Sequence, residues 1–386
     1  MKPLPEHLRA SIGLRVDLIE TPAPVVDLDA MERNIQRMAE FARKHGVRWR
    51  PHAKLHKSAD IALQLQQAGA CGACVQTLAE AEALAAGGVN DIFLTNELLA
   101  ASKLLRAASL AAQLAARGGR LALAVDSAEG VARLAEAMQV AGSSAGIDVF
   151  VEIDVGQGRC GLPPGPEAVA LAQAITAQPR LRFAGLQAYH GSAQHLRSCA
   201  ERRAAIAGAT ALAAKARSLI EAAGLGLPLV TGSGTGTLVH EAASGVYGEL
   251  QPGSFLFMDA DYARNEREPA QPAFEQALFI KTQVISARET HVVCDAGHKS
   301  HAIDSGLPQV WGLAPERALG FANGGDEHGI LTVRGSKARL PALGRMLWLV
   351  PGHCDPTVNL HDHLIGVRGG LAHGTVERII SVDARG

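Results

Sequence analysis

The chain has 386 residues, of which 47% are hydrophobic, 19% are charged and 4% are aromatic. Its 37 basic and 38 acidic side chains give a formal net charge of -1, which lacks the basic excess of a nucleic-acid-binding protein. No segment approaches the roughly 20 apolar residues of a membrane span and the first 20 residues lack the apolar core of a signal peptide, so we expect a cytoplasmic protein with neither nucleic-acid nor membrane partners.

Short apolar segments alternate with Ala-rich segments from about residue 45 to 262. In the Ala-rich segments, such as 59–69, 98–118 and 131–142, apolar residues recur every three or four positions, which predicts amphipathic helices. About eight strand–helix units predict an α/β fold with a closed (β/α)8 barrel. The expected barrel strands are 47–52, 73–77, 91–95, 121–126, 149–155, 183–189, 227–231 and 255–259.

After about residue 265 the pattern changes to short β-like segments separated by Gly, Pro and Asp turns, which predicts a smaller, mostly β domain. We place the barrel at 24–264 and the β domain at 265–386, with residues 1–23 packing against the β domain. Segment 24–28 fits a strand of either domain. The expected strands of the β domain are 278–285, 291–295, 329–333, 346–350, 364–368 and 378–382.

A G-x-G-x-x-G pattern, Gly156–Gly161, follows the expected strand 149–155. A dinucleotide site needs a helix that begins at the third glycine and an acidic residue about 20 positions later. Here Pro163 and Pro164 follow the glycines, and segment 181–186 does not end in Asp or Glu. The pattern therefore does not predict a dinucleotide site, and Arg159 needs another role.

Lys54 lies at the end of the first expected barrel strand, where functional groups of a barrel gather. From composition alone, a lysine at such a position is most often a solvated surface residue. On extended backbone, however, Lys54 shares a face with Arg48, Arg50 and His52, which can point into the barrel mouth. A lysine in a pocket with cationic neighbours is expected to have a lowered pKa and to form Schiff bases.

Two later strand ends also carry polar groups. The loop TGSGTGT at 231–237 lacks the Gly-Lys-Ser/Thr tail of a Walker A loop, but its backbone N–H groups and hydroxyls suit a phosphate monoester. A tight turn without a ligand would explain the same glycines. Segment 187–195 brings Tyr189, His190 and His195 to the expected mouth of the barrel.

In the β domain, PGHCDPT at 351–357 offers an imidazole and a carboxylate. On extended backbone His353 and Asp355 project to one face and Cys354 to the other. Imidazole and carboxylate suit Mn²⁺, Mg²⁺ or Zn²⁺, although a hydrogen-bonded turn would explain the same residues.

Taken together, RPHAK, VEIDVGQGRCG, QAYHG, TGSGTGT, ELQPGSFLFMDADY, DEHG and PGHCDPTVNLHD resemble the D-threonine aldolase and 3-hydroxy-D-aspartate aldolase group, relatives of D-serine dehydratase. The resemblance covers about residues 20 to 386. It implies an alanine racemase-like, fold-type-III pyridoxal 5'-phosphate (PLP) enzyme, with a PLP-binding barrel, a β domain and a homodimeric assembly.

The resemblance also implies roles for individual residues. Lys54 forms the Schiff base with PLP, and His195 acts near the substrate hydroxyl. His353 and Asp355 bind the divalent metal. The remaining residues contact the cofactor: Arg159 on the phenolic oxygen side, Tyr189 at the ring nitrogen, Gln76 and Thr231 elsewhere, and Gly234, Thr235 and Gly236 at the phosphate. Gly156–Gly161 then form a tight turn that presents Arg159 to the cofactor.

The expected reaction is retro-aldol cleavage of a D-β-hydroxy-α-amino acid of the D-threonine type to glycine and an aldehyde. The resemblance thus implies a homodimeric lyase that depends on a divalent metal. In the dehydratase branch of the family the metal pair is His-x-Cys with zinc. Here the second ligand is Asp355, a harder ligand that favours Mn²⁺ or Mg²⁺ and therefore an aldolase.

Alternatives remain open. Asp304–Pro308 with HCDPT resembles the hydroxyaspartate branch, which gives glycine and glyoxylate, whereas AYHGS resembles the threonine branch. A D-serine or hydroxyaspartate dehydratase and a non-catalytic PLP-binding protein are further alternatives. Alanine racemase is disfavoured because it needs a tyrosine base from the β domain, and all three tyrosines (Tyr189, Tyr247 and Tyr262) precede that domain.

Overall fold

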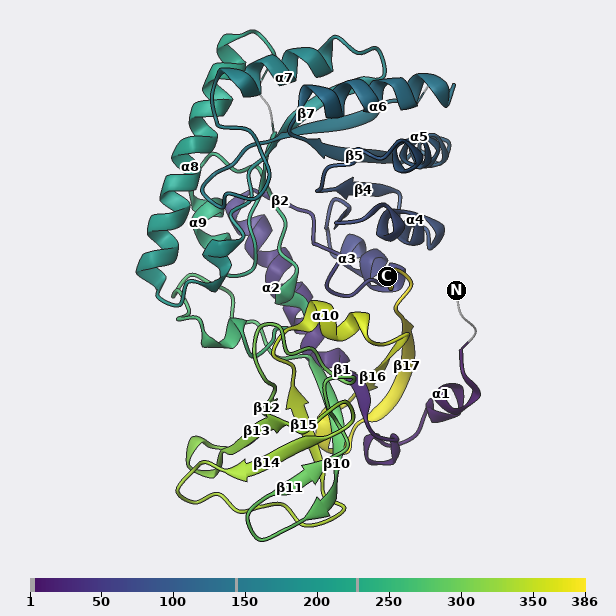
Figure 1. The fold of residues 1–386 in the computed structure, drawn as a ribbon, viewed down its shortest axis with the longest axis vertical. Helices are drawn as coiled ribbons and strands as arrows, with labels where there is room; N and C mark the ends of the chain where they lie inside the picture. Colours follow the sequence, from purple (N-terminus) through teal and green to yellow (C-terminus); the bar gives the residue numbers. More distant parts are fainter. Residues whose placement is uncertain (1–3, 143–144, 227–228) are drawn as a thin grey trace.

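The computed structural model describes residues 4–142, 145–226 and 229–386. Two sheets organise these residues: one is rolled into a barrel with helices around it, and the other forms most of a strand-rich domain below it (Figure 1). No helix in the described ranges combines the length and the apolar character that a bilayer crossing demands.

The barrel sheet has eight strands in the order β2-β9-β8-β7-β6-β5-β4-β3, and every adjacent pair is parallel. A parallel bridge between His52 and Cys74 joins the first strand to the last and closes the sheet. The predicted (β/α)8 barrel is therefore confirmed. The strands are β2 (Arg48–Trp49), β3 (Ala73–Val75), β4 (Asp91–Leu94), β5 (Arg120–Val125), β6 (Ile147–Glu152), β7 (Leu181–Gln187), β8 (Leu229–Gly232) and β9 (Glu249–Leu250).

The helices around the barrel begin and end where local sequence favours it. Thr77 and Ser198 each form a capping box with a glutamate three residues later, and Gly46 ends the first long helix in the left-handed conformation. The predicted helical segments correspond to α3, α5 and α6. The full set is α2 (Leu28–His45), α3 (Ala59–Gln67), α4 (Leu78–Ala86), α5 (Ala101–Ala115), α6 (Ala128–Val140), α7 (Pro166–Thr176), α8 (Cys199–Ala222) and α9 (Leu238–Ala243).

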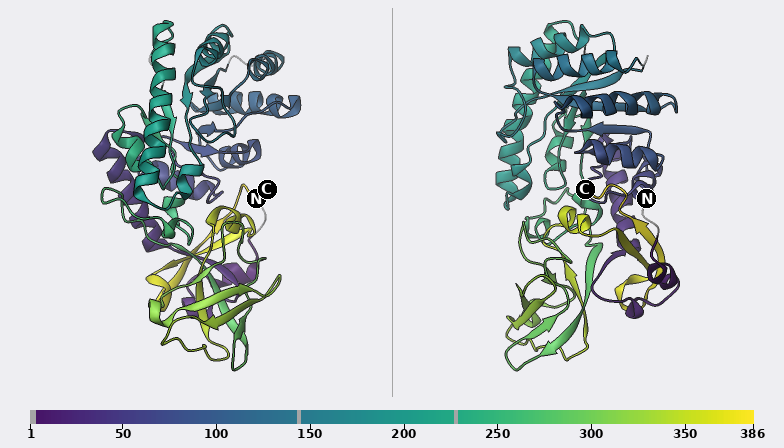
Figure 2. Two further views of the ribbon diagram at one scale, coloured as in Figure 1. Left: turned by 60° about the vertical axis from the view of Figure 1, so that its left-hand side comes forward. Right: turned by 45° about the vertical axis from the view of Figure 1, so that its right-hand side comes forward.

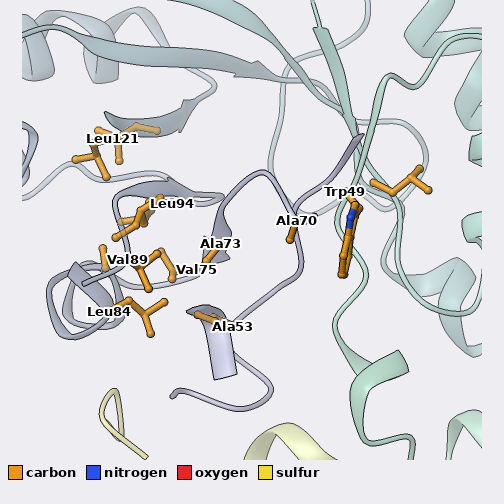
Figure 3. Close-up of a cluster of buried hydrophobic side chains, with 14 of the residues drawn as sticks. Trp49, Ala53, Ala70, Ala73, Val75, Leu84, Val89, Leu94 and Leu121 are labelled. Carbon is orange, nitrogen blue, oxygen red and sulfur yellow. The ribbon is translucent and has the colours of Figure 1, made fainter. Parts of the chain in front are cut away.

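The apolar faces of these helices pack against the outside of the strands and form the main core. Figure 3 shows part of it, where Val75 and Leu94 from neighbouring strands meet Leu84 and Val89 from the intervening helix and its loop. Ala53 belongs to the same cluster. The residue that precedes Lys54 is thus fixed in the core.

The expected strand 255–259 is wrong. Residues 254–256 form a 3-10 helix, η3 (Ser254–Leu256), and the eighth barrel strand is β9. The error has a physical reason: a fully buried apolar run has no polar face, so its pattern cannot separate a strand from a helical turn. The apolar pattern did not predict β9, because one of its two residues is Glu249, a charged residue that is buried beside Arg50. Leu227 and Pro228 of the expected strand 227–231 lie outside the described residues.

The second sheet has nine strands, arranged as β13-β14-β11-β10-β1-β16-β17 with β15 between β10 and β12. Its six predicted strands are present, whereas β12 and β13 were not predicted. The strands are β1 (Ala23–Asp27), β10 (Leu278–Ala287), β11 (Val292–Cys294), β12 (Gln309–Val310), β13 (Leu319–Asn323), β14 (Gly329–Val333), β15 (Met346–Val350), β16 (His363–Arg368) and β17 (Thr375–Ser381).

β1 answers the question that the sequence left open about segment 24–28. It pairs antiparallel with β10 and parallel with β16, so it belongs to the second sheet. Before it, α1 (Glu6–Ser11) and η1 (Val16–Leu18) lie near β17, where Gly13 N donates to Val376 O at 2.8 Å. The chain therefore starts in the β domain, forms the barrel and returns. The domain limits 24–264 and 265–386 stay a prediction.

A short helix, α10 (Cys354–Asn359), lies between the strand-rich domain and the barrel in all three views (Figures 1 and 2). The chain also forms η2 (Ser192–His195), η4 (Tyr262–Arg264), η5 (Pro315–Arg317) and α11 (Gly370–His373). Because α10 faces the barrel, the motif PGHCDPT reaches the ends of the barrel strands.

Candidate active site

A pocket is lined by residues that follow the barrel strands and by His353 and Asp355 at the beginning of α10. The residues predicted from the sequence that line it are Lys54, Gln76, Arg159, Tyr189, His195, Gly234, Thr235, His353 and Asp355. Two other predicted residues do not line it. Thr231 is fully buried and donates to Glu249, and the N–H of Gly236 donates to Gln194 behind the pocket wall.

Lys54 reaches the pocket from a turn, not from an extended strand. β2 ends at Trp49, and the N–H of Lys57 closes the turn onto Ala53 O at 2.7 Å. The Nζ of Lys54 lies 3.5 Å from Asp355 Oδ2. Burial lowers the pKa of Lys54, but the charge of the Asp355 carboxylate outweighs this and raises it overall. The expectation of a lowered pKa is therefore wrong, because the nearest charged partner is an acid from the β domain.

A polar row of His52, Gln76 and Thr95 lies beside Lys54, and only Thr95 was not predicted from the sequence. Thr95 Oγ1 accepts from Gln76 Nε2 at 2.9 Å and lies 3.2 Å from His52 Nε2. Burial lowers the pKa of His52 well below its usual range, so this imidazole is neutral. His52 and Thr95 line the pocket together with Gln76. Each follows a barrel strand, and that position is the signal that would have identified Thr95.

The glycine pattern at 156–161 forms the tight turn expected from the resemblance. Asp154 Oδ1 accepts from the backbone N–H groups of Gly156, Gln157 and Gly158 at 2.9, 3.0 and 3.1 Å. Gly156 and Gly158 have φ of 121° and 68°, values that favour glycine. The turn places Arg159 in the pocket wall, with its guanidinium carbon 5.7 Å from the centre of the Tyr189 ring.

Arg159 faces a group of acidic side chains on its other side. Its Nη2 lies 3.8 Å from Glu152 Oε1. Burial, together with the facing Glu97 carboxylate, raises the pKa of Glu152 to about 8. Tyr189 is also neutral, because burial raises its pKa. Arg159 is therefore held between a phenol and a carboxyl group that keeps its proton near neutral pH.

The glycine-rich loop after β8 offers backbone donors in a tightly packed turn. Ser233 has φ of 78°, in the left-handed region, which turns the backbone sharply at the strand end. Among the described residues, the backbone N–H groups of Gly234 and Thr235 donate to no protein acceptor. A Cβ on Gly234 would come within 2.5 Å of Gln194 Cδ. Free N–H donors in a loop that has no room for side chains fit the phosphate of PLP.

The opposite wall of the pocket carries the predicted metal ligands. His353 Nδ1 lies 2.7 Å from Asp304 Oδ2, which leaves Nε2 free, and Nε2 lies 3.8 Å from Asp355 Oδ1. That oxygen is buried without a hydrogen-bond partner. Two coordination bonds of about 2.1 Å span up to ~4.2 Å, so a single divalent ion fits between these atoms.

The expectation that His353 and Asp355 share a face of extended backbone is wrong, because the motif enters a helix. His353 precedes α10 and Asp355 lies in its first turn, while Cys354 is fully buried. Asp259 fixes the turn: its Oδ2 accepts from Cys354 N at 3.1 Å and its Oδ1 accepts from Tyr262 N at 2.9 Å. The segment that follows the last barrel strand thus holds His353 and Asp355 against the barrel mouth.

Other lining residues were not predicted either, chiefly Gln187, Gln251, Ser254 and Tyr262. Tyr262 is the most consequential, because its ring centre lies 6.2 Å from that of His195. Burial raises its pKa well above the usual range, so it is a neutral phenol. The motif ELQPGSFLFMDADY ends at Tyr262 but assigned it no role, since the residue lies in a short 3-10 helix beyond the last barrel strand.

A closed parallel barrel, a lysine and an anion loop at its carboxyl end, and a strand-rich domain that covers this mouth together define the alanine racemase-like, fold-type-III class of proteins. The family model of the alanine racemase N-terminal domain matches residues 26–261, and the chain belongs to this family. A second model, of a serine dehydratase domain, matches residues 277–367.

Named relatives cover nearly the whole chain. A 3-hydroxy-D-aspartate aldolase from Paracoccus denitrificans (strain Pd 1222) is 42% identical over 97% of this chain and 94% of its own length. A D-threonine aldolase from an Arthrobacter species is 43% identical over 95% of this chain and 93% of its own. Among solved structures, a D-threonine aldolase from Filomicrobium marinum matches with a TM-score of 0.91 and 42% identity, covering 97% of this chain and 98% of that one. The resemblance seen in the sequence is confirmed.

Proposed function

We propose that the chain is a PLP- and divalent-metal-dependent carbon–carbon lyase that cleaves D-β-hydroxy-α-amino acids of the D-threonine type to glycine and an aldehyde. The observation that carries this proposal is the short path from Lys54 to Asp355 and His353. Asp355 has one oxygen 3.5 Å from Lys54 Nζ and the other 3.8 Å from His353 Nε2. An amine for the cofactor and two ligands for a metal therefore face one another across a single pocket.

For PLP, Lys54 would hold the aldehyde carbon and the N–H groups of Gly234 and Thr235 the phosphate. Arg159 and Tyr189 would contact the ring. When bound, PLP accepts the electron pair that bond cleavage leaves on Cα of the substrate. With the neutral Tyr189 near the ring nitrogen, PLP would be a weaker electron sink than with a carboxylate there. The cleavage would therefore depend more on the metal ligands proposed on the opposite wall of the pocket.

For the metal, His353 Nε2 and Asp355 Oδ1 would be the ligands, and Asp304 would fix the imidazole of His353. When bound, a divalent ion lowers the pKa of the substrate β-hydroxyl. Asp259, Asp304 and Asp355 outweigh the effect of burial and raise the pKa of His353, which indicates a site that attracts cations. We propose Mn²⁺, with Mg²⁺ and Zn²⁺ as alternatives.

His195 is the proposed base. It lines the pocket near Tyr262, with a half-exposed side chain. Its imidazole takes the proton of the β-hydroxyl, the Cα–Cβ bond breaks, and the hydroxyl carbon becomes the carbonyl of the aldehyde. A proton then adds to Cα to give glycine, so that atoms and charge balance.

Two relatives support an aldolase but differ in substrate, so a 3-hydroxy-D-aspartate aldolase that releases glyoxylate is the second candidate. A dehydratase of D-serine or hydroxyaspartate remains a lesser alternative, supported by the domain match at 277–367. A PLP-binding protein without turnover would not need the ligand pair His353 and Asp355.

The test is product analysis after incubation of the purified protein with PLP, Mn²⁺ and D-threonine or 3-hydroxy-D-aspartate in parallel. Glycine with acetaldehyde or with glyoxylate supports the aldolase and ranks the two substrates. Ammonia with a 2-oxo acid identifies a dehydratase and contradicts the proposal. No product from either substrate, with PLP bound, favours the non-catalytic alternative.

Two further expectations accompany the proposed function. A homodimer is proposed from the family resemblance, and sedimentation equilibrium of the PLP-loaded protein checks it, since a single species of 40.3 kDa would contradict it. A cytoplasmic location stays a prediction from the sequence.

A further inference from the structure

Asp261 is a buried acid just outside the pocket that neither the sequence motifs nor the proposed metal and cofactor roles explain. Only 4% of the residue is exposed, whereas the His195 side chain that it contacts is 52% exposed. Asp261 Oδ2 lies 2.7 Å from His195 Nδ1. The acid thus holds one side of a ring whose other side is available to the pocket.

The other oxygen of Asp261 is engaged by two arginines. Arg197 Nη2 donates to Oδ1 at 2.5 Å, and Arg264 Nη2 also donates to Oδ1. Burial raises the pKa of Asp261, but hydrogen bonds from Arg197, His195 and Arg264 outweigh this and hold it below the usual range. Asp261 is therefore a carboxylate, and a carboxylate accepts hydrogen bonds but does not donate them.

The position of Asp261 is fixed by its surroundings. Arg197 Nη1 donates to Asp261 O at 2.8 Å and to Asn265 Oδ1 at 2.6 Å. Asp261 N donates to Gly352 O at 3.2 Å, next to His353, and Arg264 Nη2 donates to Ser305 O at 3.0 Å. The carboxylate is therefore tied both to the barrel side and to the segments that carry the proposed metal ligands.

An acceptor fixed at Nδ1 determines where the ring proton resides. The neutral imidazole has one protonated nitrogen, and facing a carboxylate this must be Nδ1. The lone pair then lies on Nε2. A base that takes a hydroxyl proton needs this lone pair directed toward the substrate, and a fixed tautomer keeps it there.

We propose that Asp261 is a positioning residue for the cleavage: it holds His195 in the Nδ1–H form, so that Nε2 is the atom that takes the β-hydroxyl proton. This inference rests on the proposed function of the same site and adds to it the residue that prepares the base. Arg197 and Arg264 keep the carboxylate charged and fixed.

The decisive measurement is the tautomer of His195 in the PLP-loaded protein with Mg²⁺. Protein labelled with ¹⁵N-histidine is recorded by long-range ¹H–¹⁵N NMR at pH 8.5, well above the ordinary histidine pKa of about 6.5. The signals of His195 are assigned among the 15 histidines by their loss in His195→Gln. We expect the Nδ1–H form, and an Nε2–H form in the unmodified protein overturns the proposal without any variant.

Asp261→Asn tests the consequence, because an amide also offers donors to Nδ1. We expect a shift toward the Nε2–H form, a fall in kcat of about 100-fold, the scale of a lost general base, and a KM within about twofold. Asp261→Glu, which keeps the acceptor, is expected to restore part of kcat. Asp60→Asn, on the exposed face of α3, is the matched charge control and should change neither quantity.

The outcomes separate the possible explanations. A fall in kcat with an unchanged tautomer signal means that Asp261 is only structural and overturns the proposal. If no aldehyde forms from any D-β-hydroxy amino acid, the proposed function fails instead, and the tautomer result still decides whether Asp261 positions His195. The two failures are therefore distinguishable.

Discussion

The two walls of the pocket are built differently. On the barrel wall, strand ends, backbone N–H groups and buried side chains make the site, and Thr95 and Gln194 are only 3% and 1% exposed. On the β-domain wall, Asp304 Oδ2 lies 2.7 Å from His353 Nδ1, and the side chain of Asp304 is 50% exposed. The supporting side chains of the barrel wall are thus buried. The β-domain wall combines α10, whose Cys354 and Val358 belong to the main core, with a solvent-exposed support for His353.

This difference predicts how the walls respond to change. A substitution on the barrel wall disturbs cofactor binding and, through the packed core, stability. One on the β-domain wall is expected to alter metal dependence and leave the bound cofactor in place. Separate readouts for cofactor, metal and stability can therefore test the comparison.

The largest effect is expected from Lys54→Ala on the barrel wall. Loss of the amine that holds PLP should abolish the absorbance of the bound cofactor and lower turnover by about a thousandfold or more. Absorbance spectra and product assays check this, with Lys103→Ala on the exposed face of α5 as the control. Retained activity would contradict the role of Lys54.

Asp355→Ala tests the β-domain wall. It removes the carboxylate that approaches both His353 and Lys54, so the metal-dependent rate should fall by about 100-fold while the absorbance of bound PLP remains. The rate is measured with added Mn²⁺ and with chelator. If chelator leaves the unmodified protein fully active, the metal role is refuted, and if Asp355→Ala loses PLP the two walls are not independent.

Gly234→Ala should weaken cofactor binding by about tenfold without changing metal affinity. The added methyl would collide with Gln194, whose Oε1 accepts from Gly236 N at 2.9 Å and whose Nε2 donates to Thr237 Oγ1 at 2.8 Å. Since Gln194 cannot yield without breaking these bonds, the loop must shift. Titration with PLP and, separately, with Mn²⁺ measures both affinities, and equal losses of the two would contradict the comparison.

The smallest effect concerns Glu241, which lies in α9 behind the glycine-rich loop and receives a hydrogen bond from Thr237 Oγ1 at 2.7 Å. Burial raises the pKa of Glu241 to about 7. Between the unfolded value of about 4.5 and about 7, the folded chain keeps a proton that the unfolded chain has lost. This acid therefore makes the protein less stable as pH rises through that window.

Glu241→Gln cannot titrate and should reduce the fall in Tm between pH 5 and pH 8 by on the order of 2 °C. The difference between the two pH values is compared with that of the unmodified protein and of Glu129→Gln, an exposed control on α6. An identical pH dependence in all three proteins would show that Glu241 keeps an ordinary pKa.

The sequence predicted what depends on periodic patterns and on motifs. Ala-rich segments with three- and four-residue spacing predicted α3, α5 and α6, and the alternation of strands and helices predicted the barrel, because amphipathicity follows directly from where apolar residues recur. Prediction from the sequence failed where the apolar residues have no regular spacing. The buried run at 255–259 and the two-residue strand β9 are examples.

The candidate site divides in the same way. Strand ends made Lys54, Tyr189 and the glycine-rich loop candidates, because a parallel barrel brings all its carboxyl ends to one mouth, and the family resemblance then assigned their roles and that of Arg159. Only the tertiary structure showed that Asp355 crosses from the β domain to Lys54 and reverses the expected direction of its pKa. It also brought Asp261 to His195 across 66 positions of sequence within the barrel domain, since contacts between loops at the barrel mouth depend on tertiary packing and leave no local signal in the chain.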